Sequence, residues 1–219
     1  MPADVARYGP DIPTESELKL CGSVEGKRVL ELGGAAQASI PFAKQGAHAI
    51  AVDWSPERLG ALKRRCDEED VRVELHESDL ADLAFVRADS VDLAFSASAF
   101  DLVEDLNRVF RQVHRVLRQD APLVFSVSHP AYAMIDDQAE EPLAVSRSYF
   151  DRDSAAPEGE GPFHRTISEL FTGLIRTNFR VDTVLEPSPV PGGPRSSEWR
   201  DAFRYVPRTL IIRARKEGI

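Results

Sequence analysis

A short apolar run followed at once by small residues constrains the fold of this chain more than any other feature. Arg28–Leu32 is typical of a buried strand, and residues 33–36 (Gly-Gly-Ala-Ala) separate it from a helix expected over Gln37–Gln45. A tight turn from strand to helix favours glycine where the backbone is unusual, and small side chains where a ligand approaches the main chain. The segment therefore predicts a strand–turn–helix unit whose turn is open to a ligand.

Strand and helix signals alternate along the rest of the chain. Apolar runs predict six more strands, at His48–Val52, 71–75, Val91–Phe95, Ala121–Ser128, Val181–Leu185 and Thr209–Ala214. Helical periodicity and capping signals predict three more helices, at Pro56–Glu69, Asp101–Arg118 and 166 to about 178. Repeated strand–helix–strand units imply an α/β fold, in which a parallel sheet carries helices on both faces.

Length and composition fit one domain. The 219 residues, 42% of them apolar, can bury one sizeable core but are few for two. The formal charge of −9 argues against a nucleic-acid partner, because an acidic protein repels phosphates. No apolar run approaches the roughly 20 residues of a membrane span, and the polar start does not resemble a signal peptide, so we expect a cytoplasmic protein without a membrane partner. The two cysteines lack CxxC spacing, so neither a disulfide framework nor a metal site is expected.

Two long segments interrupt the alternation. Residues 129–165 and 187–207 contain proline, glycine and, in the first of them, acidic clusters. Connections of this length within a compact domain are usually lids, binding loops or disordered segments. We expect these two to act as lid or substrate loops.

The segment from Val29 to Gln37 resembles motif I of the class I S-adenosylmethionine-dependent methyltransferases. In that motif an acidic residue precedes three glycines at alternate positions. Glu31 matches the acidic residue and Gly33 the first glycine, whereas Ala35 and Gln37 stand where the second and third glycines usually are. The resemblance implies that Glu31 lies close to the methionine ammonium of the cofactor, and that the loop runs under the cofactor's carboxylate and ribose.

Further motifs follow in the family's order. Asp53, twenty residues after Gly33, matches the acid that binds the ribose hydroxyls, and Asp79 matches the acid that commonly meets the adenine amino group. Residues 91–97 match the fourth strand with the loop after it, and residues 207–214 resemble the reversed last strand. The resemblance is closest to bacterial small-molecule methyltransferases. It implies a Rossmann-like, seven-stranded, mostly parallel sheet with an antiparallel last strand, in one methyltransferase-like domain over residues 1–219.

The resemblance also implies S-adenosylmethionine as cofactor and S-adenosylhomocysteine as product. The residues that it places at the cofactor are Tyr8, Glu31, Gly33, Gly34, Ala35, Gln37, Asp53, Trp54, Ser78, Asp79, Leu80, Ser96 and Ala97. In similar methyltransferases an N-terminal aromatic ring often covers the cofactor, which is one interpretation of Tyr8; the other is a surface anchor. Trp54 is expected either to stack near the adenine or to pack between helix and sheet.

Two histidines are the candidate catalytic residues. A methyl acceptor with an OH or NH group can require a base, and ligands of open α/β sheets bind beyond the carboxyl ends of the strands. His129 directly follows the fifth strand, so it either serves as that base or fixes the strand-exit turn before Pro130. His164 precedes a capped helix, so it either faces the same cavity or shapes the cap. Nearby aromatic residues are expected to line a substrate cavity or to pack the lid: Tyr132, Tyr149, Phe150 and Phe163.

The sequence leaves two other functions open. One is a non-catalytic module that binds S-adenosylmethionine or S-adenosylhomocysteine, because Ala35 and Gln37 depart from the glycine motif. The other is a nicotinamide-dependent oxidoreductase, because Gly33-x-Ala35-x-x-Ala38 is a degraded dinucleotide fingerprint. Glu31 argues against the second, since a carboxylate would sit badly beneath a pyrophosphate. We expect a small-molecule methyl acceptor, whose identity and whose O-, N- or C-methylation stay open, as does the oligomeric state.

Overall fold

A computed structural model describes residues 4–34, 37–136, 139, 141, 143–151 and 162–218. A seven-stranded sheet with the order β3-β2-β1-β4-β5-β7-β6 forms its centre. The strands are β1 (Arg28–Leu32), β2 (His48–Asp53), β3 (Val73–Glu77), β4 (Leu93–Ala97), β5 (Pro122–Ser128), β6 (Phe179–Leu185) and β7 (Thr209–Lys216). The first five strands pair in parallel, and β7 runs antiparallel to both β5 and β6. The predicted mostly parallel sheet with a reversed last strand is confirmed.

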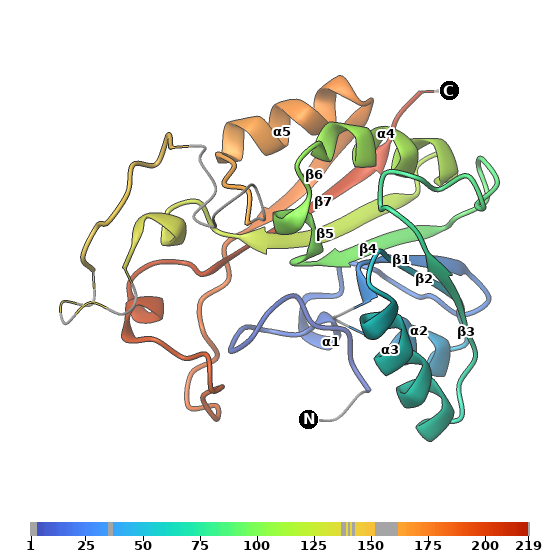
Figure 1. The fold of residues 1–219 in the computed structure, drawn as a ribbon, viewed down its shortest axis with the longest axis horizontal. Helices are drawn as coiled ribbons and strands as arrows, with labels where there is room; N and C mark the ends of the chain where they lie inside the picture. Colours follow the sequence, from blue (N-terminus) through green and yellow to red (C-terminus); the bar gives the residue numbers. More distant parts are fainter. Residues whose placement is uncertain are drawn as a thin grey trace.

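Helices cover both faces of this sheet, as predicted. In Figure 1, α1 (Glu15–Leu18), α2 (Ser39–Lys44) and α3 (Pro56–Glu68) lie on one face, whereas α4 (Leu106–Val116) and α5 (Ile167–Arg176) lie on the other. The described residues also include the 3₁₀ helices η2 (Ala99–Leu102), η3 (Tyr132–Met134) and η5 (Asp201–Arg204). No helix in the described ranges combines the length and the apolarity that crossing a membrane requires.

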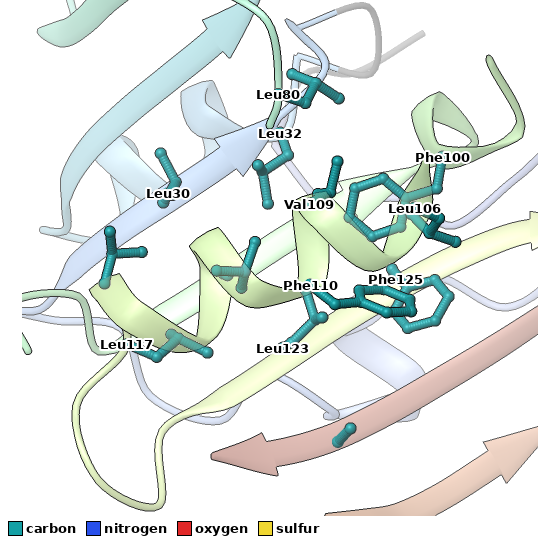
Figure 2. Packing of buried hydrophobic residues seen from close by; sticks show 14 of the residues in the cluster. Leu30, Leu32, Leu80, Phe100, Leu106, Val109, Phe110, Leu117, Leu123 and Phe125 are labelled. Carbon is teal, nitrogen blue, oxygen red and sulfur yellow. The ribbon is translucent and has the colours of Figure 1, made fainter. Parts of the chain in front are cut away.

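The largest part of the core lies between α4 and the sheet. Figure 2 shows α4 with Leu106, Val109 and Phe110 directed at strands that contribute Leu30 and Leu123. These side chains are at most 5% exposed. Full burial of such side chains contributes about 1.5–3 kcal/mol each, so this helix fixes the segment that precedes it.

The predicted helix Asp101–Arg118 is shorter than expected. Asp105 is the N-cap of α4, because its carboxylate accepts the N–H of Arg108 at 3.0 Å. Asp101 instead lies in η2. Because Asp105 caps the first turn, α4 begins at Leu106 and not at Asp101. Asp101 is therefore free to point away from the helix axis.

Other boundaries also differ from the predictions by a few residues, and β6 and β7 are each two residues longer than expected. The helix predicted over Gln37–Gln45, α2 of the structure, begins at Ser39. Gln37 has a left-handed backbone with φ +53° and cannot be helical. The third strand begins at Val73 instead of residue 71, and the fourth at Leu93, with Val91 forming only an isolated bridge to Leu117. The single-turn helix α1 was not predicted.

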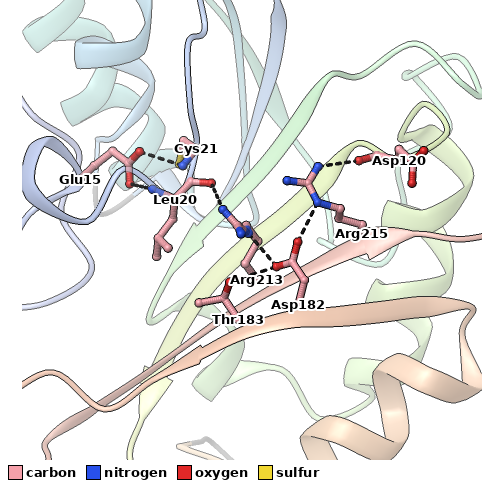
Figure 3. A network of polar contacts seen from close by, with 8 residues as sticks. All are labelled: Glu15, Leu20, Cys21, Asp120, Asp182, Thr183, Arg213 and Arg215. Carbon is pink, nitrogen blue, oxygen red and sulfur yellow. Dashed lines mark hydrogen bonds and ion pairs between the residues drawn. The ribbon is translucent and has the colours of Figure 1, made fainter.

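A polar network ties the N-terminal segment to the last two strands. Asp182 in β6 accepts hydrogen bonds from Arg213 and Arg215 in β7, each at 2.7 Å (Figure 3). Arg213 also donates to the carbonyl of Leu20 at 3.2 Å. Within the same segment, the Glu15 carboxylate accepts the N–H of Leu20 at 3.0 Å. These contacts therefore hold the N-terminal segment against β7.

The described parts of the two long connections lie beyond the carboxyl end of β5, on the left of Figure 1. The first contains η3, and the second contains η5. Their position is the one expected for loops over a site at the strand ends.

Candidate functional site

The turn after β1 requires glycine at its first position. Gly33 has φ +89°, and a Cβ atom placed on it would lie 2.2 Å from the Cβ of Ala99. Its N–H donates to the carbonyl of Val52 at 2.8 Å, so the turn also joins β1 to β2. Gly34 has no positive φ, and an added Cβ would lie 3.3 Å from Leu62. Ala35 lies outside the described residues.

Glu31 caps the helix that follows this turn. Its two carboxylate oxygens accept the N–H groups of Ala38 and Ser39 at 2.8 and 2.9 Å. The side chain is fully buried, and this burial raises its pKa. The acidic position of the motif therefore satisfies otherwise unpaired donors at the N-terminus of α2, which the side chain of the N-cap residue does not do.

Asp53 joins the end of β2 to the glycine turn. Its Oδ2 accepts the N–H of Gly34 at 2.8 Å, and its Oδ1 accepts the N–H of Ser55 at 2.8 Å and Nε of Arg58 at 3.0 Å. The carboxylate is wholly buried. It lies where a ribose-binding acid would lie, and the same contacts give it a structural role.

Trp54 and Asp79 line one cavity, of about 420 Å³, between β2, the turn after β3 and η2. We call it the Trp54 cavity. The indole is 37% exposed, and the guanidinium of Arg58 lies 4.5 Å from the ring centroid. Asp79 uses Oδ1 to accept the N–H of Ala81 at 2.7 Å. Leu102 and Val103 form the opposite wall. An exposed aromatic face beside a carboxylate suits a purine with an amino group.

Three of the expected cofactor residues have side chains that bond to the main chain or pack in the core. Ser96 is fully buried and donates to the carbonyl of Leu32 at 2.8 Å, which ties β4 to β1. Leu80 is fully buried in the core. Ser78 donates to the carbonyl of Asp82 at 2.9 Å. These residues can reach a ligand through their main chains.

A second cavity, of about 740 Å³, lies between the N-terminal segment, the end of β4 and residues 190–198. We call it the N-terminal cavity. Ala97, the last residue of β4, and Ser98 line it on one side, and Tyr8 lines it from the N-terminal segment. The ring of Tyr8 is nevertheless fully buried and packs 5.4 Å from Phe95, with its hydroxyl bonded to Glu15. This burial contradicts a surface anchor, whereas a cofactor-covering role of Tyr8 stays a prediction.

A third cavity, of about 250 Å³, lies beyond the end of β5. We call it the Asp101 cavity. Its walls are mostly apolar or aromatic, with a few charged groups: Asp101, Val127, Ser128, Tyr132, Ala133, Arg147, Pro162, Phe163, His164, Arg165 and Leu170. The expected lining role of Tyr132 and Phe163 agrees with this placement.

Asp101 is the polar group that sequence reasoning missed. Its Oδ2 accepts the N–H and the hydroxyl of Ser128, both at 2.9 Å, whereas Oδ1 has only a longer 3.2 Å contact to the same N–H. Removal from water raises the pKa of this carboxyl. Its position directly after β4, at the carboxyl ends of the strands, was the available signal, but the helical pattern around it pointed to a helix face.

Arg165 fixes the segment that carries Asp101. Its guanidinium donates to the carbonyls of Phe100 at 3.2 Å and Glu104 at 2.9 Å, and also to that of Val103. Desolvation lowers the pKa of Arg165. Because Asp101 lines the Asp101 cavity while Val103 lines the Trp54 cavity, one arginine holds the wall between both.

The two candidate catalytic histidines differ in placement. His164 lines the Asp101 cavity and donates through Nε2 to the carbonyl of Tyr149 at 2.8 Å. The cap of α5 is formed without it, by Thr166 and Glu169. His129 is 4% exposed; Nδ1 accepts the N–H of Ala131 at 3.1 Å, and Nε2 donates to Glu186 at 2.8 Å. One ring nitrogen of His129 therefore serves the strand-exit turn, and the other ties this turn to Glu186, directly after β6.

The sheet and its cavities define a class of protein. Cavities lie at the carboxyl ends of parallel strands, at the point where the strand order reverses between β1 and β4. That is the ligand-binding position of doubly wound α/β folds. The glycine turn, a cradle that a side chain would fill, and the acids after β2 and β3 fit an adenosine-type cofactor.

Comparisons with known proteins find similarity to methyltransferases. Residues 29–120 match the model of a family described as "Methyltransferase domain". A crystal structure of an S-adenosylmethionine-dependent methyltransferase from Mesorhizobium loti has a TM-score of 0.74 at 26% identity, over 92% of this chain and 96% of that one. A structure from Listeria monocytogenes, described as a candidate enzyme of the same kind, has a TM-score of 0.76 at 24% identity, over 93% and 96%. The ubiquinone biosynthesis O-methyltransferase of Hahella chejuensis is 30% identical over 48% of this chain and 44% of its own length.

The methyltransferase-domain match over residues 29–120 and these similar structures support a class I S-adenosylmethionine-dependent methyltransferase, with S-adenosylmethionine as the cofactor. The Rossmann-like fold of this chain is that of the two solved structures.

Proposed function

We propose that this chain transfers a methyl group to a hydroxyl or amine of a small molecule bound in the Asp101 cavity. The observation that carries this proposal is the position of η2 between two cavities. Asp101 lines the Asp101 cavity, and the next residue, Leu102, lines the Trp54 cavity. Acceptor and cofactor can therefore lie on either side of one short, rigid helix.

The cofactor would lie across the strand ends in the order of the sheet. Its nucleoside would occupy the Trp54 cavity, with Asp79 towards the adenine amino group and Asp53 towards the ribose. Its amino-acid end would then lie above Gly33 and the end of β4, at Ala97. When bound, S-adenosylmethionine supplies a sulfonium methyl carbon that is already strongly electrophilic. The protein has only to orient the acceptor and exclude water.

Asp101 is the proposed proton acceptor. The proton of the acceptor's O–H or N–H passes to a carboxylate oxygen of Asp101, while the freed lone pair forms the bond to the methyl carbon and the electrons of the broken C–S bond stay on sulfur. A raised pKa brings the carboxylate nearer to the pKa of a protic acceptor, which favours the transfer. His164, on the same wall, would orient the acceptor. His129 would hold the loop in place.

The walls of the Asp101 cavity favour a partly apolar acceptor of modest size. Tyr132 and Phe163 provide aromatic surface, and Arg147 and Arg165 bring positive charge to the cavity. A small aromatic or unsaturated molecule with an acidic substituent would match both features.

A transfer assay tests this proposal. The protein is incubated with S-adenosylmethionine and a panel of small phenols, amines and aromatic acids, and S-adenosylhomocysteine and methylated products are measured by mass spectrometry. We expect acceptor-dependent formation of both. Asp101→Asn should slow turnover about 10²- to 10⁴-fold, the usual contribution of a base, without weakening S-adenosylhomocysteine binding. An Asp101→Asn variant that turns over as fast as the parent, or a parent that methylates none of the panel, would contradict the proposal.

A further inference from the structure

Two aromatic rings join the two long connections beside the Asp101 cavity. Tyr132, in η3, lines that cavity, and its ring packs edge-on against the ring of Phe203, in η5, at a centroid distance of 5.2 Å. Phe203 is 4% exposed, and it is not among the described residues that line the cavity. The wall that would face an acceptor therefore has a second, buried ring packed against it.

The reversed last strand brings these two rings together. Because β5 and β7 pair antiparallel, with Ser128 opposite Thr209, the connection that leaves β5 begins beside the end of the connection that enters β7 (Figure 1). The N–H of His129 donates to the carbonyl of Arg208 at 2.8 Å, which continues the pairing past the strand ends. The contact between η3 and η5 thus follows from the topology of the sheet.

The main chain of η3 does not by itself determine the direction of the Tyr132 ring. This helix is a single turn of three residues, in which the carbonyl of Tyr132 accepts the N–H of Ile135 at 2.9 Å. The carbonyl of His129 accepts the N–H of Ala133 at 3.1 Å. These bonds fix the backbone, whereas the side-chain torsion angles of Tyr132 depend on what its ring packs against.

Phe203 is supported from several sides. The guanidinium of Arg208 lies 4.8 Å from its ring centroid, and the indole of Trp199 packs against it at 5.5 Å with an interplanar angle of 87°. Glu198 pairs with Arg208 and so helps to keep the guanidinium over the ring. The N–H of Phe203 donates to the carbonyl of Arg200 at 3.1 Å. A buried ring with these neighbours is a rigid support for the ring of Tyr132.

We propose that Phe203 is a positioning residue that sets the acceptor specificity of the Asp101 cavity through the ring of Tyr132. This inference rests on the proposed function, in which the acceptor occupies that cavity. Because the cavity measures only about 250 Å³, the direction of one ring in its wall determines the size and shape of the acceptors that fit. An aromatic acceptor depends strongly on that direction, since aromatic rings attract one another only at defined angles. The second connection therefore selects acceptors, although none of its described residues lines the cavity.

Acceptor kinetics of Phe203→Leu test this inference. KM and kcat are measured for a one-ring phenol that the parent methylates and for its two-ring analogue, at saturating S-adenosylmethionine. Phe203→Leu should raise KM for the one-ring acceptor about 2- to 10-fold, the equivalent of one aromatic pair, with kcat and the affinity for S-adenosylhomocysteine unchanged. Its ratio of kcat/KM, two-ring over one-ring, should rise, because the smaller leucine lets the Tyr132 ring retreat. Phe203→Tyr, which keeps the ring, should restore the parental KM.

Further variants separate positioning from support of the fold. Tyr132→Leu removes the ring through which Phe203 acts, so adding Phe203→Leu to it should change KM no further. Tyr205→Leu is the matched control, because it removes a 65% exposed ring from the same segment, and it should change no kinetic constant. If Phe203→Leu does not fold, Phe203→Met, which fills more of the space with a flexible chain, gives the same comparison.

Other results overturn the inference in distinguishable ways. Parental KM values in Phe203→Leu overturn it and leave the proposed function intact. A fall in kcat that is equal for both acceptors, with unchanged KM and a lower melting temperature, shows that Phe203 only supports the fold. Additive effects of Tyr132→Leu and Phe203→Leu show that Phe203 does not act through Tyr132. A parent that methylates only aliphatic amines overturns this inference alone, whereas a parent that methylates nothing in the panel overturns the proposed function as well.

Discussion

Gly33 lies so close to Ala99 that the turn after β1 and the helix η2 leave no room for a methyl group between them. A Cβ atom on Gly33 would lie 2.2 Å from the Cβ of Ala99, and the φ of Gly33 is +89°. The glycine turn and the wall between the Trp54 and Asp101 cavities are thereby packed as one unit. In the proposed arrangement, this contact would couple the cofactor side of the site to the acceptor side.

Substitutions at Gly33 and Ala99 should separate the energy of overpacking from the energy of backbone strain. Gly33→Ala should lower the free energy of unfolding by about 2–5 kcal/mol, because it adds overpacking to backbone strain. Ala99→Gly in the same chain should recover about 1–3 kcal/mol by making room, while the strain at φ +89° remains. Denaturant unfolding of both single variants and the double variant measures the coupling. Strict additivity of the two substitutions would show that the contact carries no energy.

The left-handed backbone of Gln37 should make glycine favourable at that position. Gln37 has φ +53°, a conformation that costs a side-chain-bearing residue about 1–2 kcal/mol, against about 0.5–1 kcal/mol of chain entropy for glycine. We expect Gln37→Gly to raise the free energy of unfolding by about 0.5–1 kcal/mol. Gln45→Gly is the matched control, because Gln45 has φ −85°, and it should lower stability by a similar amount. Destabilisation by Gln37→Gly would mean that its side chain, not its backbone, matters in the turn.

The buried carboxyl of Asp101 should make stability depend on pH. An acid whose pKa is raised in the folded state ionises less readily there than in the unfolded chain, where its pKa is about 3.9. Ionisation therefore costs folding free energy as the pH rises above that unfolded value. We expect Asp101→Asn to raise the melting temperature, with a larger gain at about pH 7 than at about pH 4.5. Asp67→Asn, at an exposed position of α3, should give no such trend. A lower melting temperature for Asp101→Asn at neutral pH would refute the account of this carboxyl.

The contacts of His129 predict a structural phenotype. His129→Ala removes an acceptor from the N–H of Ala131 and a partner from Glu186, which should lower the free energy of unfolding by about 1–3 kcal/mol. Affinity for S-adenosylhomocysteine should not change. Glu186→Gln, which keeps a hydrogen-bond acceptor for Nε2, should be nearly neutral. A large loss of turnover in His129→Ala with unchanged stability would restore it as a catalytic base.

The fold could be predicted well from sequence because its signals are local. Apolar runs located each of the seven strands, and Ser55 with Pro56 marked the start of α3. The glycine turn was also predictable, since positive φ and close approach demand a small residue at Gly33. Where the predicted helix Asp101–Arg118 failed, the apolar spacing of Leu102 and its neighbours continued across a cap that periodicity does not detect.

The candidate site was harder to predict because side-chain direction depends on distant partners. The choice between a base and a turn residue at His129 depends on Glu186, 57 positions later. Tyr8 was the natural cofactor candidate of its segment, and it does line the N-terminal cavity, but the packing of its ring on Phe95 could not be foreseen. Asp101 is buried by loops whose sequences have no clear hydrophobic periodicity. Such roles follow from packing and not from the local sequence.

The central claim, that the nucleoside of S-adenosylmethionine lies in the Trp54 cavity, is tested most directly by the fluorescence of Trp54. The chain has two tryptophans, and Trp199→Phe leaves Trp54 as the sole reporter while keeping an aromatic ring beside Phe203. Titration of this variant with S-adenosylhomocysteine should give a saturable change in Trp54 emission, whereas NAD should give none. Calorimetric binding of S-adenosylhomocysteine without any change in Trp54 emission, or an equal response to NAD, would contradict the account.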